Sequence, residues 1–230
     1  MPVHRLPSSH PSTAGCYELF AHGAIRAIGD LKGKSVGFLG DQDALISIFT
    51  AWVGLDPKKD LTLVGDPTAK AFESFIQGKL DAYLGFPPEP QELHARKVGH
   101  VILRTAEDRP WSQYYCCMLA GNREFVRSHP VATKRVIRAI LKAADFCASA
   151  PERAARLLVN GGFVQRYDYA LETLRDVPYG LWREYDAEDT VRFYALRAYE
   201  LGFIKRTPQK IIADGSDFRL FNELKREMKA

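Results

Sequence analysis

Short apolar segments alternate with helical ones between residues 15 and 105, and this alternation most limits how the chain can fold. After Gly40, apolar residues recur at helical spacing from Leu45 to Trp52, and Gly54 follows where a helix would end. Strands are expected at residues 16–21, 35–39, 61–64, 80–86 and 101–105. Strands separated by helices predict an α/β fold with a mostly parallel sheet that is covered on both faces.

About 110 residues at the C-terminal end follow a different pattern, because helical periodicity dominates there. One more strand is expected at residues 114–120. Helices are expected at residues 130–149, 150–160, 167–177, 188–201 and 217–229. Val136, Ile140, Ala144 and Cys147 form one apolar face of the first of these helices. Helices with such faces and almost no strands of their own need a sheet to pack on.

The composition is that of a soluble globular protein, because 46% of the 230 residues are hydrophobic and 26% are charged. The longest apolar stretch, residues 44–55, includes Ser47 and Thr50 and is shorter than the roughly 20 residues of a membrane span. Residues 1–14 are rich in Pro, Ser and His and contain no apolar run. We expect a disordered tail there and no signal peptide.

Charge and cysteine spacing argue against nucleic-acid and metal sites. The net charge of +4 is small, and the basic stripe of Arg135, Arg138 and Lys142 is interpreted as the solvated side of an amphipathic helix. Cys16, Cys116, Cys117 and Cys147 match neither C-x-x-C nor a zinc pattern, and the six histidines are scattered. We expect unpaired, buried thiols, no metal, no cofactor and no nucleic-acid partner.

The loops at the carboxyl ends of the expected strands are the best candidates for a ligand site. They comprise residues 40–43, 65–67 and 85–89, to which residues 109–114 and the first strand add side chains. Aromatic rings would supply flat walls, amides and a hydroxyl would supply hydrogen bonds, and carboxylates would supply charge. The candidate ligand-binding residues are Tyr17, Asp41, Gln42, Phe86, Glu89, Trp111, Ser112 and Gln113.

Each candidate has a structural alternative. Asp41 or Asp43 could cap the following helix, residues 87–88 could simply end a strand, and Trp111 and Tyr114 could belong to the core. If the acidic side chains do face a ligand, their charges would repel a sulfonate or nitrate. The loops then predict a neutral or cationic organic solute, for example a heteroaromatic such as a pyrimidine.

Four segments together resemble a known family. They read DLKGKSVGF at residues 30–38, GLDPKKDLTLV at 54–64, AFESFIQGKLDAYLGFPPEPQEL at 71–93 and NREFVRSHPVATKRV at 122–136. They are similar to solute-binding proteins of bacterial ABC importers, in the nitrate/sulfonate/taurine and thiamine-pyrimidine-precursor-like group. The resemblance runs from about residue 15 to residue 229.

This resemblance implies a type II periplasmic-binding-protein-like fold. Residues 15–120 would form one complete α/β lobe with crossover strands, and residues 121–230 would be the C-terminal helices of a second lobe that lacks its N-terminal part. Such a protein captures a small organic molecule in the interlobe cleft without chemistry. It acts as a monomer in the periplasm and delivers its solute to an ABC permease in the inner membrane. If Met1 is the true start, the chain would instead stay in the cytoplasm.

Three other functions remain open. Some relatives of this group make the thiamine pyrimidine, and Cys116–Cys117 faintly resemble their cysteine-rich loop. The sequence contains no G-x-S-x-G, P-loop or G-x-G-x-x-G motif, so we expect no enzyme. A ligand-sensing module of a regulator would normally follow a helix-turn-helix, and none precedes Gly15. A truncated, non-functional remnant would expose apolar helices.

Overall fold

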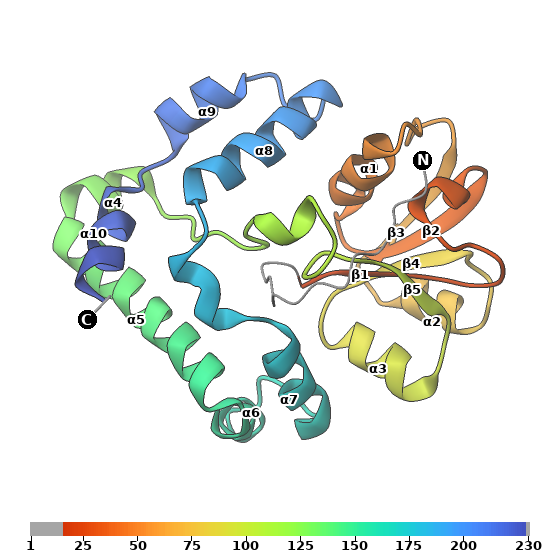
Figure 1. Ribbon diagram of the computed structural model, residues 1–230, viewed down its shortest axis with the longest axis horizontal. Helices are drawn as coiled ribbons and strands as arrows, with labels where there is room; N and C mark the ends of the chain where they lie inside the picture. Colours follow the sequence, from red (N-terminus) through yellow and green to blue (C-terminus); the bar gives the residue numbers. More distant parts are fainter. Residues whose placement is uncertain (1–15, 229–230) are drawn as a thin grey trace.

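The structure, a computed structural model, describes residues 16–228, so the tail expected at residues 1–14 lies outside the described part (Figure 1). An α/β part and a helical part lie side by side, connected near the start of β1. The strands are β1 (Glu18–Ala21), β2 (Lys34–Leu39), β3 (Leu61–Asp66), β4 (Ala82–Gly85) and β5 (His100–Arg104). All five expected strands before residue 106 are therefore confirmed.

The strands form one sheet in the order β3-β2-β4-β1-β5. β2 is parallel to both β3 and β4, whereas β1 is antiparallel to β4 and to β5. The sheet is thus mixed, and the expected parallel arrangement holds for its β3-β2-β4 half. Because β1 runs opposite to β4, the start of β1 lies at the same edge as the carboxyl ends of β2, β3 and β4.

A hydrophobic core lies on each face of the sheet, because successive residues of a strand point to opposite faces. Leu19 and Ala21 of β1 join a core with the 3-10 helix η1 (Ile28–Leu31) and α1 (Asp43–Trp52). Phe20, between them, points to the other core, which is formed with α2 (Lys70–Ile76) and α3 (Glu89–Arg96). The α/β part therefore has the helix-sheet-helix layering that the sequence predicts.

Gly99 connects α3 to β5 and gives a sharp test of this packing. Its φ of +66° lies in the left-handed region, and an added Cβ would come within 2.9 Å of Phe75 Cζ and 3.0 Å of Ala21 O. We expect Gly99→Ala to lower the free energy of unfolding by about 2–3 kcal/mol, because backbone strain and steric overlap add. Urea unfolding followed by circular dichroism measures this loss.

Gly23→Ala is the matched control, since Gly23 has a φ of +62° but nothing within 4 Å of an added Cβ. It should cost only about 1 kcal/mol, the backbone contribution. Equal losses in the two variants would show that an added Cβ at residue 99 does not meet Phe75 at 2.9 Å.

The helical part contains α4 (Arg123–Ser128), α5 (Pro130–Ser149), α6 (Pro151–Asn160), α7 (Tyr167–Asp176), α8 (Ala187–Glu200), α9 (Pro208–Gly215) and α10 (Arg219–Glu227), with 3-10 helices η2 (Trp111–Gln113) and η3 (Tyr179–Arg183). The five expected helices are confirmed, while α4 and α9 were not predicted. The helices form an arc in Figure 1, from α8 and α9 through α5 to α6 and α7. In the described part of the chain, no helix has the length and apolar character required to cross a membrane.

The strand expected at residues 114–120 is wrong, because the chain there is irregular. β1, the strand that it would have accompanied, already pairs with β4 on one side and β5 on the other. The segment therefore has no free strand edge to pair with. It leads instead from η2 to α4 along the inside of the helical arc.

Candidate functional site

The candidate site lies at the sheet edge where β2, β3 and β4 end and β1 begins. Gly40 has a φ of +67°, which only glycine adopts readily, and this turns the chain from β2 toward α1. The amide of Gly40 donates to the Asp66 carbonyl at 3.2 Å and so holds the first two loops together. We call Tyr17, Asp41, Gln42, Phe86 and Glu89, which lie along this edge, the strand-end cluster.

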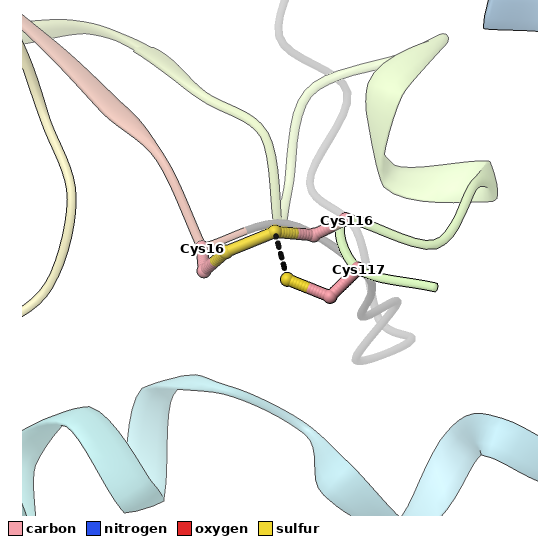
Figure 2. Close-up of side chains that lie close together, drawn as sticks. All are labelled: Cys16, Cys116 and Cys117. Carbon is pink, nitrogen blue, oxygen red and sulfur yellow. Dashed lines mark hydrogen bonds between the residues drawn. A yellow bond between two sulfur atoms is a disulfide. The ribbon is translucent and has the colours of Figure 1, made fainter. Parts of the chain in front are cut away.

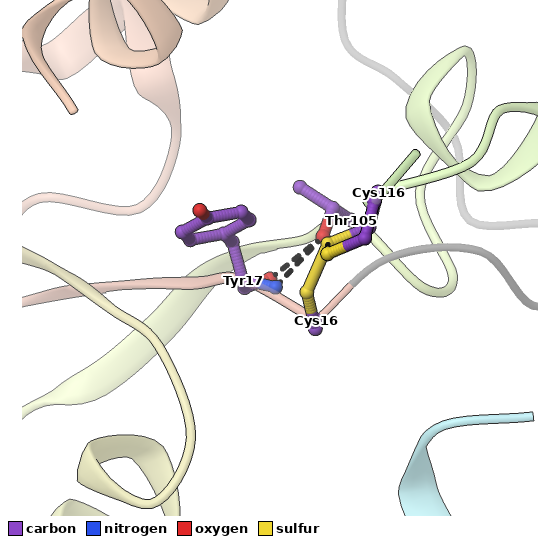
Figure 3. The surroundings of a disulfide bond; sticks show 5 residues. Cys16, Tyr17, Thr105 and Cys116 are labelled. Carbon is purple, nitrogen blue, oxygen red and sulfur yellow. Dashed lines mark hydrogen bonds between the residues drawn. A yellow bond between two sulfur atoms is a disulfide. The ribbon is translucent and has the colours of Figure 1, made fainter. Parts of the chain in front are cut away.

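Tyr17 is held in place by its backbone (Figure 3). Its amide donates to Thr105 Oγ1, and its carbonyl accepts from both the Thr105 hydroxyl and the Thr105 amide, each at 3.0 Å. The Tyr17 ring lies 5.2 Å from the Phe86 ring, between centroids. The pKa of Tyr17 is raised, first by burial and then by the nearby Cys117 and Asp41. The Tyr17 and Phe86 rings therefore lie side by side, and Asp41 is near enough to Tyr17 to act on its pKa.

Glu89 is bound within the cluster and does not project freely. Its carboxylate accepts from the Tyr83 hydroxyl at 2.9 Å and from the Phe86 amide at 3.2 Å. Burial raises the pKa of Glu89. Asp41, by contrast, is exposed, and the neighbouring Gln42 has a buried Oε1 without a partner in residues 16–228.

The other three candidates lie elsewhere. Trp111 and Ser112 are each only 2% exposed, and Gln113 is exposed. The Trp111 ring contacts Phe49 and Trp52 of α1 and Phe193 of α8, with centroids 4.6, 5.8 and 5.7 Å away. The structure thus gives Trp111 the core position of its structural alternative and does not bring it into an open cleft.

The expectation of unpaired cysteines is wrong for two of the four. Cys16 and Cys116 form a disulfide, and Cys117 Sγ lies 3.5 Å from Cys116 Sγ (Figure 2). The bond forms because the chain enters and leaves the α/β part at one place, although 100 residues separate the two cysteines. Cys117 and Cys147 are free.

These three sulfur atoms are the only group in residues 16–228 that has the spacing of a metal site, all lying within 4.8 Å of one another. Cysteine binds a metal ion as a thiolate, and two of these three sulfur atoms are joined in the disulfide. The cluster as it stands is a covalent link between the entering and leaving segments.

An apolar groove of about 1950 Å³ runs from Phe86 of the strand-end cluster along the inside of the helical arc. Phe86 and Pro87 line its sheet end, and residues 115–121 with α4, α5, α7, α8 and α10 line most of the rest. Val136 and Ile140 belong to the apolar face of α5 for which the sequence predicts a covering sheet. Their side chains line the groove and are 51% and 46% exposed. The groove also includes Leu119 and Phe163, which no sequence signal singles out because they belong to no periodic pattern.

The electrostatics of the edge are acidic. The loops at residues 40–43, 65–69 and 85–89 contain Asp41, Asp43, Asp66 and Glu89 and no Lys, Arg or His. An anion brought to this edge would meet like charges, whereas a cation or a neutral polar molecule would not.

Sequence comparison identifies relatives of the chain. Residues 1–154 match the family model described as NMT1/THI5 like. The bicarbonate-binding protein CmpA of Synechococcus sp. is 26% identical over 122 residues, which are 53% of this chain and 27% of that protein. The nitrate/nitrite binding protein NrtA of Nostoc sp. is 23% identical over 133 residues, 56% of this chain and 30% of that protein. The matches thus span less than a third of these relatives.

Solved structures show the same fold, which is that of type II periplasmic binding proteins. The nitrate-binding protein NrtA from Synechocystis superposes with a TM-score of 0.71 at 13% identity, over 94% of this chain and 66% of that one. The aliphatic sulphonate binding protein SsuA from Escherichia coli gives 0.65 at 17% identity, over 86% and 63%. The desulfurization enzyme DSZB gives 0.54 at 14% identity, over 94% and 77%.

Proposed function

Because the chain belongs to the family described as NMT1/THI5 like, we propose that it is the solute-binding component of an ABC-type import system. It captures a small organic molecule between its α/β part and its helical part and performs no chemistry. Its partner is an ABC permease of the inner membrane, and it acts as a monomer in the periplasm. The Cys16–Cys116 disulfide supports this location, since disulfides persist in oxidising compartments.

The observation that carries the proposal is the meeting of the strand-end cluster with the groove. Phe86 belongs to both, and the Tyr17 ring lies 5.2 Å from the Phe86 ring. A pocket with apolar walls and a few polar groups at one end is typical of small-molecule sites. Domain closure about the segments next to Cys16 and Cys116 would enclose a solute there.

The acidic loops favour a neutral or cationic organic solute as the ligand. The named relatives bind bicarbonate, nitrate or sulphonate, all of them anions. Asp41 and Asp43 at the start of α1 oppose an anion at that position. The proposed ligand class therefore departs from that of the relatives, for a reason confined to this chain's own loops.

An enzyme is the second candidate, because the desulfurization enzyme DSZB shares the fold and three cysteines cluster beside the groove. Formation of a product on incubation with a bound compound would favour it. A compound that is recovered unchanged would favour pure binding.

The test is a thermal melt of the 230-residue chain with pyrimidines, amines, aromatic acids, sulfonates, nitrate and bicarbonate. A ligand that binds the folded state raises the melting temperature in a saturable way. We expect stabilisation by a neutral or cationic organic compound. Stabilisation by nitrate, bicarbonate or a sulfonate alone would overturn the proposed ligand class, and a melt that no compound shifts would overturn the binding function.

Asp41→Asn tests the charge argument directly. If the stabilising compound is a cation, the substitution should weaken its binding about tenfold by calorimetry, because a charge-assisted contact is lost. Glu73→Gln is the matched control, since Glu73 is exposed on α2 and does not line the groove. Equal affinities of Asp41→Asn and the wild type for a cation would place that ligand away from Asp41.

A further inference from the structure

A second pocket, of about 500 Å³, lies where the helical part meets the sheet, between α3 and α7. Figure 1 shows α7 beside α3 at the lower side of the molecule. Its charged and polar lining comes from the start of β1, α3, the end of β5 and α7. These elements contribute Glu18, Gln91, His94, Arg104, Glu172 and Asp176 to the lining.

The basic groups of this pocket are already occupied. Glu18 accepts from His94 Nε2 at 2.7 Å and from Arg104 Nε at 3.2 Å. Arg104 also faces Glu107, with Nη1 and Oε2 4.0 Å apart. These contacts satisfy Glu18. Among the described residues, the pocket lining as a whole is acidic, because it contains four carboxylates, Glu18, Glu107, Glu172 and Asp176, and only His94 and Arg104 as basic groups.

Glu172 and Asp176 lie four residues apart on α7, and so on the same face of the helix. Within residues 16–228, neither carboxylate has a Lys, Arg or His nitrogen within 4.0 Å. The pKa of Glu172 is raised, first by its partial burial and then by Asp176. In the described part of the chain, neither α7 carboxylate thus forms a direct ion pair, and the nearest cations, His94 and Arg104, are bound to Glu18.

Gln91 supplies an independent sign of a missing ligand. It is only 3% exposed and lines the pocket together with Asp176. Its amide oxygen, Oε1, is buried and can only accept a hydrogen bond. That oxygen has no partner in residues 16–228. Buried polar groups are nearly always satisfied, so an unpaired carbonyl beside a pocket points to a donor from outside the protein.

The arrangement favours an organic cation over a metal ion. Three ligand atoms that share a metal ion must lie close together. In residues 16–228, only the three cysteines have ligand atoms within 4.8 Å of one another, so no three carboxylate or imidazole groups of this pocket are placed to bind one ion. Acceptors spread over a pocket suit a ligand with donors at more than one point. We propose that this pocket binds a small organic cation, a protonated aliphatic amine. The site is separate from the strand-end cluster and goes beyond the proposed function.

The probe is 1,4-diaminobutane, titrated calorimetrically into the full chain at pH 7.5, where both amines are protonated. We expect saturable binding that weakens as salt is added, because the attraction is electrostatic. 1,4-Butanediol, which has the same length and no charge, should give no binding. Absence of diamine binding, or equal binding of the diol, would overturn the proposal.

Variants locate the site. Glu172→Gln and Asp176→Asn keep side-chain size and should each weaken the diamine about tenfold, and together about a hundredfold. Gln91→Leu removes the unpaired carbonyl and should also weaken it about tenfold. Asp168→Asn is the matched control on the same helix, since Asp168 pairs with Arg166 outside the pocket, and it should bind like the wild type.

Two results would contradict the assignment even if the diamine binds. Loss of binding in Asp41→Asn, with Glu172→Gln and Asp176→Asn unaffected, would place the amine in the strand-end cluster and support only the proposed function. The second result concerns MgCl₂ at the same concentration as the diamine. If it displaces the diamine from the wild type, and if the α7 variants no longer bind magnesium, the pocket is a metal site. Unchanged melting temperatures of the α7 variants show that they are folded.

Discussion

Cys116→Ser is expected to lower the free energy of unfolding by about 4 kcal/mol. The Cys16–Cys116 disulfide closes a loop across a sequence separation of 100 residues, which includes the whole sheet. A cross-link over that length removes much of the conformational freedom of the unfolded chain and should stabilise the folded state by about 4–5 kcal/mol. Urea unfolding followed by circular dichroism, without reductant, measures the difference.

The denaturant slope provides a second signature. Without the cross-link the unfolded chain expands further and exposes more surface, so the slope should increase in Cys116→Ser. Reduction of the wild type with a dithiol should reproduce both effects, and reduction of the variant should add nothing.

Cys117→Ser is the matched control for this prediction. Its side chain is the neighbouring thiol, which is exposed and free, so the substitution should change the stability by no more than about 0.5 kcal/mol. A peptide map under non-reducing conditions should recover the Cys16 and Cys116 peptides joined. If they separate, and if Cys116→Ser matches Cys117→Ser in stability, the disulfide does not exist in the protein.

Local patterns in the sequence predict the elements of this fold but not their pairing. The strands and the five longer expected helices follow from alternation and helical periodicity. The antiparallel placement of β1 between β4 and β5 joins segments more than 60 residues apart in sequence, as in the Glu18–Gly85 pair. No local signal encodes such a choice, because it depends on which strand edge is left free.

Two helices were missed although their start signals are present. Asn122 accepts from the Phe125 amide at 3.1 Å and caps α4. Thr207 accepts from the Lys210 amide at 3.4 Å, and Pro208 occupies the first position of α9. Both helices are short, so their apolar periodicity is weak and the capping residue is the stronger signal.

One general rule of α/β folds predicts where the residues of the candidate site lie. Ligand loops gather at the carboxyl ends of parallel strands, and this rule brings Tyr17, Asp41 and Phe86 together. The rule has nothing to say of Trp111, whose surroundings depend on Phe193, more than 80 residues further along the chain. For the same reason, the partner of Cys16 could not be identified from spacing alone.

Trp111→Ala is expected to lower the free energy of unfolding by about 4 kcal/mol, and it decides between the two interpretations of this residue. The side chain is 2% exposed and lies between Phe49 of α1 and Phe193 of α8. Its removal leaves a cavity that the rigid sheet and two helices cannot fill, and large-to-small changes of this kind cost about 3–5 kcal/mol. Because α8 belongs to the helical part, the loss also weakens the attachment of that part to the sheet.

Two variants separate packing from ligand binding. Trp111→Phe keeps a ring in the cavity and should cost about 1–2 kcal/mol. Trp52→Ala removes an indole that is 47% exposed in the same aromatic cluster, and it should cost less than Trp111→Ala. If Trp111 belongs to the core, Trp111→Phe should bind the stabilising solute like the wild type. If instead Trp111→Ala is no more destabilising than Trp52→Ala but abolishes binding, Trp111 contacts the solute and the core interpretation is wrong.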